Sequence, residues 1–348
     1  MATVTFGCGS SHSPLLTVPG GLWPQWSEFR DHRGELLDQQ GVATTFEELA
    51  QRAPERLGEQ LRREILYERY AACQRWIARI SSSIVHADID ALVVVGDDQY
   101  GEVFERSNVP AIYIYCGDEV LNKGLELRPE LPEAAQMGLG GAAGPADRRY
   151  PTAGPLARHL VGELVRQGFD IARGDELPPG KGIGHAFGFV INRLLPHRDL
   201  PLVPVLVNCY FAPNQPTPER CWQLGRALAG AVSSFEEDAR VGIMASGGLS
   251  HFVVDEEIDR QVLALLDEGR PEDLVKLPQH RLNSGTSEIR NWIVAAAALG
   301  DTPVTWSQYV PCYRSEAGTG LGAAFALWGS PRERRAQPGA AHRPSYTE

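Results

Sequence analysis

The sequence lacks long apolar runs and any excess of basic residues. No apolar segment approaches the roughly 18 residues that a membrane-spanning helix needs. Acidic residues outnumber basic ones by 44 to 33, a net charge of −11, which argues against nucleic acids and anionic membranes as partners. Residues 1–6 have neither the basic region nor the apolar core of a signal peptide, so we expect a cytoplasmic protein.

Cysteines are few and widely separated. None of the six belongs to a CxxC pair. In a cytoplasmic protein of this size they are expected to be buried thiols, not a disulfide framework or zinc ligands. They are Cys8, Cys73, Cys116, Cys209, Cys221 and Cys312.

Strand-like and helix-like segments alternate along the chain. Hydrophobic residues make up 43% of the sequence and charged residues 22%, as in an ordinary globular protein. The apolar run 91–95 predicts a strand buried on both faces, and the amphipathic stretch 155–167 predicts a helix. This alternation predicts an α/β fold: a single domain, 1–329, with a central mixed sheet flanked by helices. We expect a mostly helical segment at 47–81 and a disordered tail at 330–348.

Four further segments carry specific expectations. The stretch 117–152 is rich in glycine, proline and charge, which predicts a long loop that could cover a site. Within it, residues 138–144 look superficially like a dinucleotide-binding loop, but no strand precedes them and no helix clearly follows. Pro204 in the predicted strand 202–207 favours an edge strand or a bulge. The small residues at 320–327 predict a helix.

Three of the nine histidines lie among small residues near predicted strand ends or glycine-rich turns. His12, His185 and His251 are each flanked by Gly or Ser, which lets a ligand approach the backbone closely. Taken singly, each is better explained as a hydrogen-bonded turn histidine. Taken together with nearby carboxylates, they favour a functional site. The carboxylates are Asp97, Asp98 and Glu288.

Glu288 has two explanations at this point. It lies near the start of the predicted helix 284–299, where a negative charge suits the positive end of the helix dipole without any further function. Alternatively, it is a metal ligand held rigidly by that helix. Two imidazoles and one carboxylate on one face of a metal leave three positions open, as in non-haem iron(II) oxygenases. The remaining histidines could then move protons near neutral pH.

From about residue 3 to residue 326 the chain resembles the class III extradiol ring-cleavage dioxygenases, of the type of the protocatechuate 4,5-dioxygenase beta chain and 2,3-dihydroxyphenylpropionate dioxygenase. The helical segment near 30–80 falls outside this resemblance and looks like an insertion. Each matching motif is short, and their common order makes the resemblance specific. The motifs are at 11–14, 91–100, 184–187, 246–251, 287–292 and 319–323.

The resemblance implies roles for individual residues. His12 and Glu288 would bind the metal, and His185 and His251 would be the acid/base pair. Gln99 stands where the family has its second metal histidine, so it is the third expected ligand. A glutamine carbonyl is a neutral oxygen donor and binds Fe(II) less strongly than imidazole does.

The departure at Gln99 leaves alternatives open. Asp98, next to it, could supply a carboxylate instead, and the metal could be zinc or absent. The first hypothesis is a non-haem iron(II)-dependent extradiol-type dioxygenase that cleaves a catechol-like ring with dioxygen. The second is a hydrolase, decarboxylase or isomerase on the same fold, and the third is a non-catalytic partner subunit or ligand binder.

The resemblance also implies partners. A small aromatic substrate and dioxygen would enter the site, and the chain would form a homo-oligomer, with a small partner subunit as a further option. Several basic residues could meet a substrate carboxylate, although most such charges are merely solvated. They are Arg148, Arg149, Arg173 and Lys181.

Overall fold

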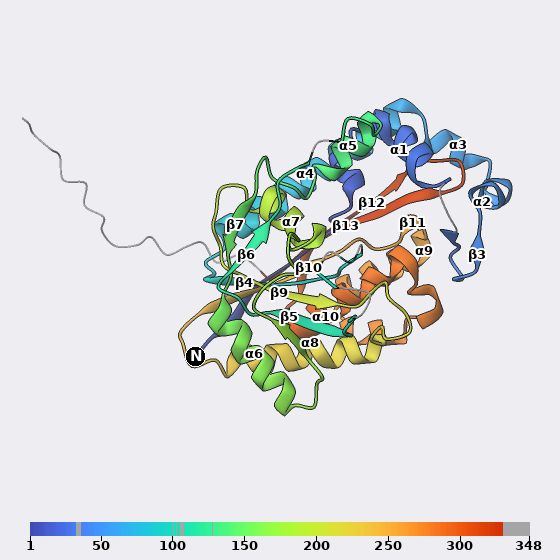
Figure 1. Ribbon diagram of the computed structural model, residues 1–348. Helices are drawn as coiled ribbons and strands as arrows, with labels where there is room; N and C mark the ends of the chain where they lie inside the picture. The colour runs from blue at the N-terminus through green and yellow to red at the C-terminus, as the bar shows by residue number, and fades with distance from the viewer. Residues whose placement is uncertain (33–35, 100, 102, 105–107, 127, 330–348) are drawn as a thin grey trace, which may run out of the picture.

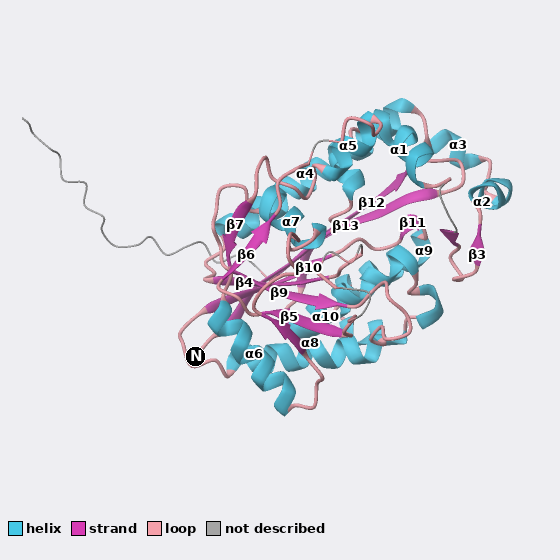
Figure 2. Cartoon of the chain, in the orientation of Figure 1, coloured by secondary structure: helices cyan, strands magenta, loops and turns pink. Residues whose placement is uncertain are grey.

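The computed structural model describes residues 1–32, 36–99, 101, 103–104, 108–126 and 128–329. In this part of the chain one nine-stranded mixed sheet is covered by helices on both faces (Figure 1; Figure 2), which confirms the predicted α/β fold. All six cysteines are buried free thiols, as expected. No described helix is long and apolar enough to cross a membrane. The predicted tail, 330–348, lies outside the described residues.

Four parallel strands form the centre of the sheet. They lie side by side in the order β1 (Thr3–Ser10), β10 (Arg240–Ser246), β4 (Ala91–Gly96) and β9 (Leu202–Val207). Because parallel neighbours end at the same edge of a sheet, the residues that follow these strands meet there.

Other strands extend the sheet on both sides. Beyond β9 lie β5 (Ile112–Tyr115), antiparallel to it, and then β8 (Ala172–Gly174). Beyond β1 lies β13 (Thr319–Trp328), which pairs antiparallel with β1, β11 (His251–Val253) and β12 (Val304–Tyr313).

The side chains of β4 show why the sequences of the central strands are continuous apolar runs. Successive side chains point to opposite faces of a sheet. Ala91, Val93 and Val95 join one hydrophobic core, while Leu92 and Val94 join the other. Both faces of β4 are therefore covered, as its unbroken apolar sequence predicts.

Each face of the sheet is covered by its own set of helices. The first core holds α6 (Gly154–Arg166), α8 (Pro218–Ser233), α9 (Glu256–Asp267) and α10 (Ile289–Leu299). The second holds α1 (Trp23–Arg30), α4 (Arg63–His86), α5 (Glu133–Leu139) and α7 (His185–Phe189), which continues as a π-helix, Val190–Leu194. Figure 1 shows α6, α8 and α10 on the side of the sheet opposite to α1, α4 and α5.

The predicted helical segment near 30–80 is broken into several pieces. The strands β2 (Leu36–Leu37) and β3 (Ala43–Thr44) form a short hairpin before α2 (Phe46–Arg52) and α3 (Arg56–Gln60). Thr45 and Glu48 form a reciprocal capping box at the start of α2, which satisfies otherwise unpaired backbone N–H groups. Pro54 falls in the gap between α2 and α3, where a break was expected. That this segment is an insertion stays a prediction.

The predicted helix at 320–327 is wrong. These residues form most of β13, which is buried throughout and pairs with β1, β11 and β12. The small residues of β13 allow neighbouring elements to pack closely against it. A Cβ added at Gly322 would lie 1.9 Å from the carboxylate of Asp259 on α9. Tertiary packing therefore overrides the local preference of alanine for helix.

The expectation of an edge strand or bulge at Pro204 is also wrong. β9 lies inside the sheet between β4 and β5. The pairing of β9 with β5 ends at the pair Ile114 and Val205, so Pro204 falls one residue beyond the paired stretch. The missing N–H of Pro204 is tolerated because β5 makes no ladder bond at this point.

The segment 117–152 contains more regular structure than expected. The strands β6 (Glu119–Asn122) and β7 (Arg148–Pro151) pair with each other, and α5 lies between them. Of the glycines at 138–144, Gly138 lies within α5 and the others follow its end, and they open no described helix. The remaining short helices are η1 (Pro14–Thr17), η2 (Gly20–Leu22), η4 (Pro271–Lys276), η5 (Gln279–Arg281) and η6 (Ser284–Glu288).

Helices α8 and α10 pack so closely that a glycine is required between them. A Cβ added at Gly225 of α8 would lie 2.2 Å from the carbonyl oxygen of Val294 on α10. Gly230 lies in the same helix, but a Cβ added there would meet no atom within 4 Å. The two glycines form a matched pair in which only the first is constrained by packing.

We predict opposite effects for alanine at these two positions. Gly225→Ala should lower the free energy of unfolding by about 1–3 kcal/mol, because the helices must separate. Gly230→Ala should raise it by up to about 1 kcal/mol, because alanine is the better helix former. Urea denaturation measures both. A Gly225→Ala protein as stable as wild type would contradict the close packing.

A buried carboxyl ties α9 to the loop before β11. Asp259 accepts hydrogen bonds from Ser250 N at 2.7 Å, Ser250 Oγ at 2.6 Å and the Tyr309 hydroxyl at 2.7 Å. Burial raises the pKa of Asp259 to about 7, although these hydrogen bonds act to lower it. The native protein therefore keeps a proton that the unfolded chain loses near pH 4.

This difference predicts that stability falls as pH rises. Between about pH 4 and pH 7 the native state binds more protons than the unfolded state, so the free energy of unfolding decreases with pH. Each pKa unit corresponds to about 1.4 kcal/mol. Asp259→Asn carries no charge, so its stability relative to wild type should increase across this range. Denaturation curves at several pH values test this, and parallel pH profiles for the two proteins would refute it.

Candidate metal centre

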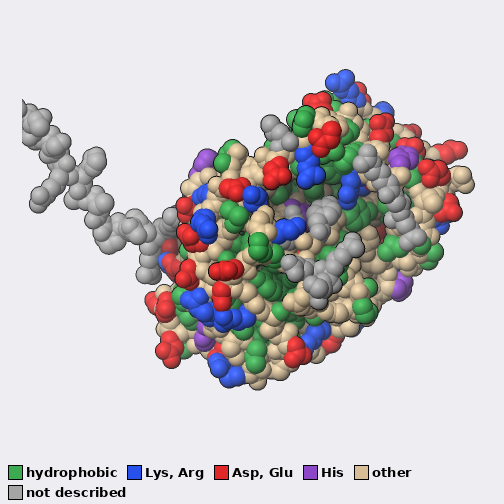
Figure 3. Space-filling view, viewed as in Figure 1, with side chains coloured by type: hydrophobic (Ala, Val, Ile, Leu, Met, Phe, Trp, Pro, Cys, Tyr) green, Lys and Arg blue, Asp and Glu red, His purple; other side chains and the backbone are tan. Residues whose placement is uncertain are grey.

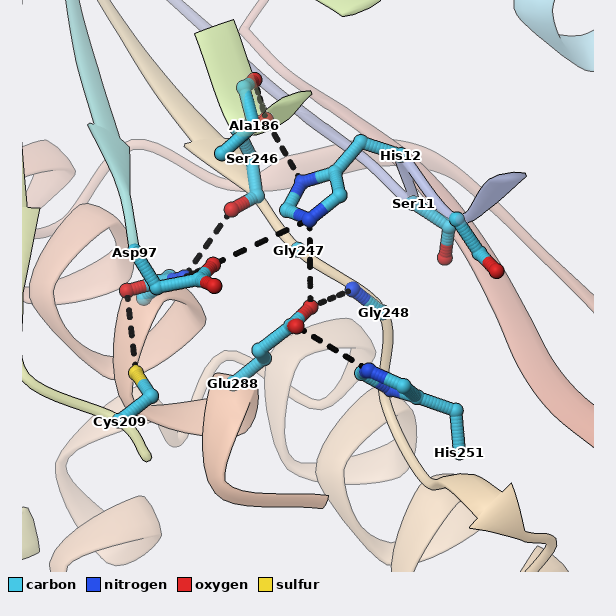
Figure 4. A network of polar contacts seen from close by, with 12 residues as sticks. Ser11, His12, Asp97, Ala186, Cys209, Ser246, Gly247, Gly248, His251 and Glu288 are labelled. Atoms are coloured by element: carbon cyan, nitrogen blue, oxygen red, sulfur yellow. Dashed lines mark hydrogen bonds and ion pairs between the residues drawn. The ribbon is translucent and has the colours of Figure 1, made fainter. Parts of the chain in front are cut away.

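Polar residues follow all four parallel strands at their common edge. His12 comes two residues after β1, and Asp97 directly after β4. Ser246 ends β10, and Tyr210 comes shortly after β9. The strand order brings these distant parts of the sequence together in one place, shown in Figure 4.

The start of α10 delivers the acidic residue of the site. Glu288 is the last residue of η6 and immediately precedes α10. The indole N–H of Trp292, one turn into α10, donates to Gly247 O at 3.0 Å, which fixes the helix against the loop after β10. The backbone N–H of Gly248 donates to Glu288 Oε2 at 2.8 Å. The carboxylate is therefore held by the loop as well as by its own helix.

Hydrogen bonding indicates which nitrogen of His12 faces the site. Its Nδ1 lies 3.0 Å from Ser246 Oγ, and this hydroxyl donates to Ala186 O at 2.7 Å. Since the single hydroxyl proton is already used, His12 Nδ1 must be the donor in its contact with Ser246. The Nε2 atom of the neutral ring then carries the lone pair. It lies 3.6 Å from Glu288 Oε2 and 3.9 Å from Asp97 Oδ1 (Figure 4).

Asp97 and Asp98 have different surroundings although they are adjacent in sequence. Asp97 Oδ1 accepts from Asn291 Nδ2 at 3.2 Å, and the same amide donates to Ser246 O at 3.0 Å. Asp98 instead accepts the backbone N–H groups of Val103 and Phe104, at 2.8 and 2.6 Å. Asp98 therefore shapes its own loop, and Asp97 is the carboxylate beside His12.

His251 contacts the other oxygen of Glu288. Its Nε2 lies 3.0 Å from Glu288 Oε1 and 2.9 Å from the Tyr210 hydroxyl. Tyr210 also donates a hydrogen bond to Glu288 Oε1. The sequence analysis missed Tyr210. The signal available was the polar segment after the apolar strand 202–207, the same kind of signal that singled out 96–99.

Burial and charge act against each other at Glu288. Burial alone would raise its pKa, but the neighbouring His251 and His12 and the hydrogen bonds from His251 and Tyr210 hold the pKa of this carboxyl well below its ordinary value. The pKa of the Tyr210 phenol is raised far above 10 by burial and by the nearby carboxylates of Glu288 and Asp97. The site thus contains an ionised glutamate beside a protonated tyrosine.

His185 completes the cluster from another element. It begins α7, and the preceding Gly184 has φ 89°, a conformation that glycine adopts without strain. The rings of His185 and His12 meet edge to face, with centroids 4.9 Å apart. Ligand atoms of His12, Asp97 and His185 all lie within 4.8 Å of one another, which makes them a group that could hold a metal ion.

The structure brings all five predicted site residues together. His12, Gln99, His185, His251 and Glu288 line the same pocket, with Gln99 half-buried in its wall. The pocket borders a larger cavity of about 750 Å³ that also reaches His12 and His185. The roles assigned to these residues stay predictions.

The donor set suits a divalent cation. The His12 lone pair and two buried carboxylates converge within 4 Å, and such groups repel one another unless a positive charge lies between them. Imidazole and carboxylate are ligands for iron, manganese and zinc.

Comparisons with known proteins identify the family of this chain. The family model described as the catalytic LigB subunit of aromatic ring-opening dioxygenase matches residues 76–325, which include Asp97, His185, His251 and Glu288. Gallate dioxygenase of Pseudomonas putida strain KT2440 is 36% identical over 121 residues, which cover 32% of this chain. That match spans only 34% of the relative's length. The chain belongs to the LigB family of aromatic ring-opening dioxygenase subunits.

Proposed function

We propose that this protein is a non-haem iron(II)-dependent dioxygenase that opens the ring of a catechol-like compound in the extradiol manner. The observation that carries the proposal is that Asp97 and Glu288 each present a carboxylate oxygen to His12 Nε2, at 3.9 and 3.6 Å, with His185 and His251 close beside them. Family membership supports a ring-opening reaction. The identity of the metal and the position of ring cleavage are parts of the proposal.

In this proposal His12 Nε2, Glu288 Oε2 and the Asp97 carboxylate hold the iron. A bound iron(II) ion would supply a charge that draws both hydroxyl oxygens of the substrate to one place and would react with dioxygen. Gly248 N, His251 and Tyr210 hold the carboxylate of Glu288, and Ser246 holds the His12 ring. These contacts keep the ligands in position before any substrate arrives.

His251 is suited to hold and transfer a proton. Its Nδ1 lies 3.2 Å from Leu249 O, and because a carbonyl only accepts, this nitrogen carries a proton. The Tyr210 hydroxyl donates its single proton to Glu288 Oε1, so His251 Nε2, 2.9 Å from that hydroxyl and 3.0 Å from Glu288 Oε1, is a donor as well. In this proposal His251 therefore gives up its Nε2 proton as an acid and recovers one as a base.

His185 is proposed as the second acid/base group. Its ring lies on the side of His12 that borders the cavity, where a substrate must enter. It also belongs to the cluster of candidate metal ligands, so metal content of a His185 variant distinguishes the two roles.

One observation favours a second candidate function. The third donor beside His12 and Glu288 is a carboxylate or the Gln99 amide, where the family has imidazole, and oxygen-rich sites also suit manganese or magnesium. A hydrolase, decarboxylase or isomerase on the same fold would use such a metal without redox change. Turnover in the absence of oxygen would identify this function.

Oxygen uptake tests the proposed function. Protein purified without air and loaded with Fe(II) should consume one dioxygen for each catechol-type ring that it opens. His185→Gln and His251→Gln should keep their iron and lose about 10²–10⁴-fold in rate, because proton transfer is removed and the ligands are not. An iron-loaded wild-type protein that consumes no oxygen with any catechol would overturn the proposal. Loss of iron from either histidine variant would make that residue a ligand.

The third metal ligand can be assigned by comparing two neighbouring positions. Asp97→Asn should lower iron content strongly, because an anionic donor is lost beside His12. Gln99→Ala is the matched control and should leave iron content near that of wild type. Iron analysis of both proteins, purified side by side, gives the answer. The reverse pattern would show that Gln99 is the ligand and that Asp97 is not.

A further inference from the structure

A buried ion pair lies in the wall of the metal pocket. Arg314 follows β12, and Asp31 follows α1; they are only 4% and 2% exposed. Arg314 Nε donates to Asp31 Oδ2 at 2.9 Å, and Nη2 donates to Oδ1 at 2.5 Å. Asp31 also accepts hydrogen bonds from Ser27 Oγ at 2.6 Å and Thr319 Oγ1 at 2.5 Å. The pair is thus fixed from both sides.

The ion pair leaves one edge of the guanidinium available. A guanidinium offers two edges, one formed by Nε and one Nη, the other by both Nη atoms. Asp31 occupies the first edge. Among the described residues none accepts a hydrogen bond from Arg314 Nη1, and Arg314 lines the pocket that holds His12, His251 and Glu288. The edge formed by both Nη atoms is the part of this buried cation left for a ligand.

A second arginine lines the same pocket. Arg30, the residue before Asp31, lines both the metal pocket and the 750 Å³ cavity. Its guanidinium lies 5.9 Å from the centre of the Phe252 ring, and Phe252 directly follows His251. Both arginines thus line the metal pocket, and Arg30 lines the cavity as well.

The cavity is basic although the protein is acidic. Its lining includes Arg128 and Lys181 in addition to Arg30, and Lys123, which pairs with Asp147 at 2.8 Å, against the single carboxylate of Glu126. The whole chain has 44 acidic and 33 basic residues. Figure 3 shows several Lys and Arg side chains, among Asp and Glu, on one face of the molecule. The excess of basic residues in the cavity lining attracts anions to the site.

We propose that Arg314, held by Asp31, and Arg30 form an anion subsite that binds a carboxylate on the ring of the substrate. This inference rests on the proposed function, because it places the ring at the metal. A carboxylate is planar and matches the two-nitrogen edge of Arg314.

The sequence suggested four basic residues as partners of a substrate carboxylate. Of these, only Lys181 is placed where it could take that role. Arg148 pairs with Asp199, and Arg173 pairs with Asp175, with side chains 40% and 51% exposed. Neither they nor Arg149 line the pocket or the cavity. Lys181 does line the cavity, farther from the metal ligands than Arg30, which borders both spaces.

The test compares two compounds that differ only in the carboxylate. Gallate and pyrogallol share three adjacent hydroxyl groups, and only gallate carries a carboxylate. Oxygen uptake gives kcat and KM for each. Calorimetric titration without oxygen gives the affinity of the iron-loaded protein for each compound independently of turnover.

Four variants separate charge recognition from folding. Arg314→Lys keeps a cation for Asp31 but lacks the two-nitrogen edge. The double variant Asp31→Asn with Arg314→Met removes both charges and leaves no buried ion unpaired. Arg30→Met keeps an apolar stem beside Phe252. Arg270→Met, at an exposed arginine paired with Glu268 and Asp273, is the control.

The expected result is a selective loss. Each pocket variant should raise KM and the dissociation constant for gallate about 10- to 100-fold and change those for pyrogallol less than about threefold, with kcat little altered. The control should change neither. Equal weakening for both compounds, or no weakening, would overturn the subsite. Selective loss of gallate binding in a protein that consumes no oxygen would uphold the subsite and refute the proposed function.

Discussion

The site depends on one constraint: two buried carboxylates each lie within 4 Å of the same nitrogen of His12. Asp97 and Glu288 are 1% exposed, and both face His12 Nε2. Burying like charges together costs several kcal/mol unless a counter-charge offsets it. The parallel order of β1, β10 and β4 forces the convergence, because their ends share one edge of the sheet. The fold therefore forms a site for a cation, because its own residues balance only part of the negative charge of Asp97 and Glu288.

The residues around the metal position have two roles: some hold the metal ligands and others transfer protons. Gly248 N holds one oxygen of Glu288, while His251 and Tyr210 hold the other. The contact of Trp292 with Gly247 ties α10 to the loop that presents Gly248. One glutamate thus links the metal position to the proposed acid/base histidine. A shift of α10 would disturb both at once, which explains why its packing against α8 is so close at Gly225.

The sequence predicts the parts of this site that follow from local pattern. Apolar runs located the central strands, and polar residues after them located His12 and the segment that contains Asp97. Local pattern does not decide which of Asp97, Asp98 and Gln99 points inward, because the loop turns when Asp98 binds the N–H groups of Val103 and Phe104. Pairings between distant segments were also out of reach. Examples are the burial of β13 in the sheet and the contact between Asp31 and Arg314.

The most direct test of this account is the location of iron in a crystal of the iron-loaded protein, measured by anomalous scattering at the iron absorption edge. The account predicts one strong peak within about 2.5 Å of His12 Nε2, a Glu288 oxygen and an Asp97 oxygen, since metal–ligand bonds to nitrogen and oxygen are about 2.0–2.2 Å long in such sites. A peak elsewhere, or none at this point in protein shown to contain iron, would contradict it.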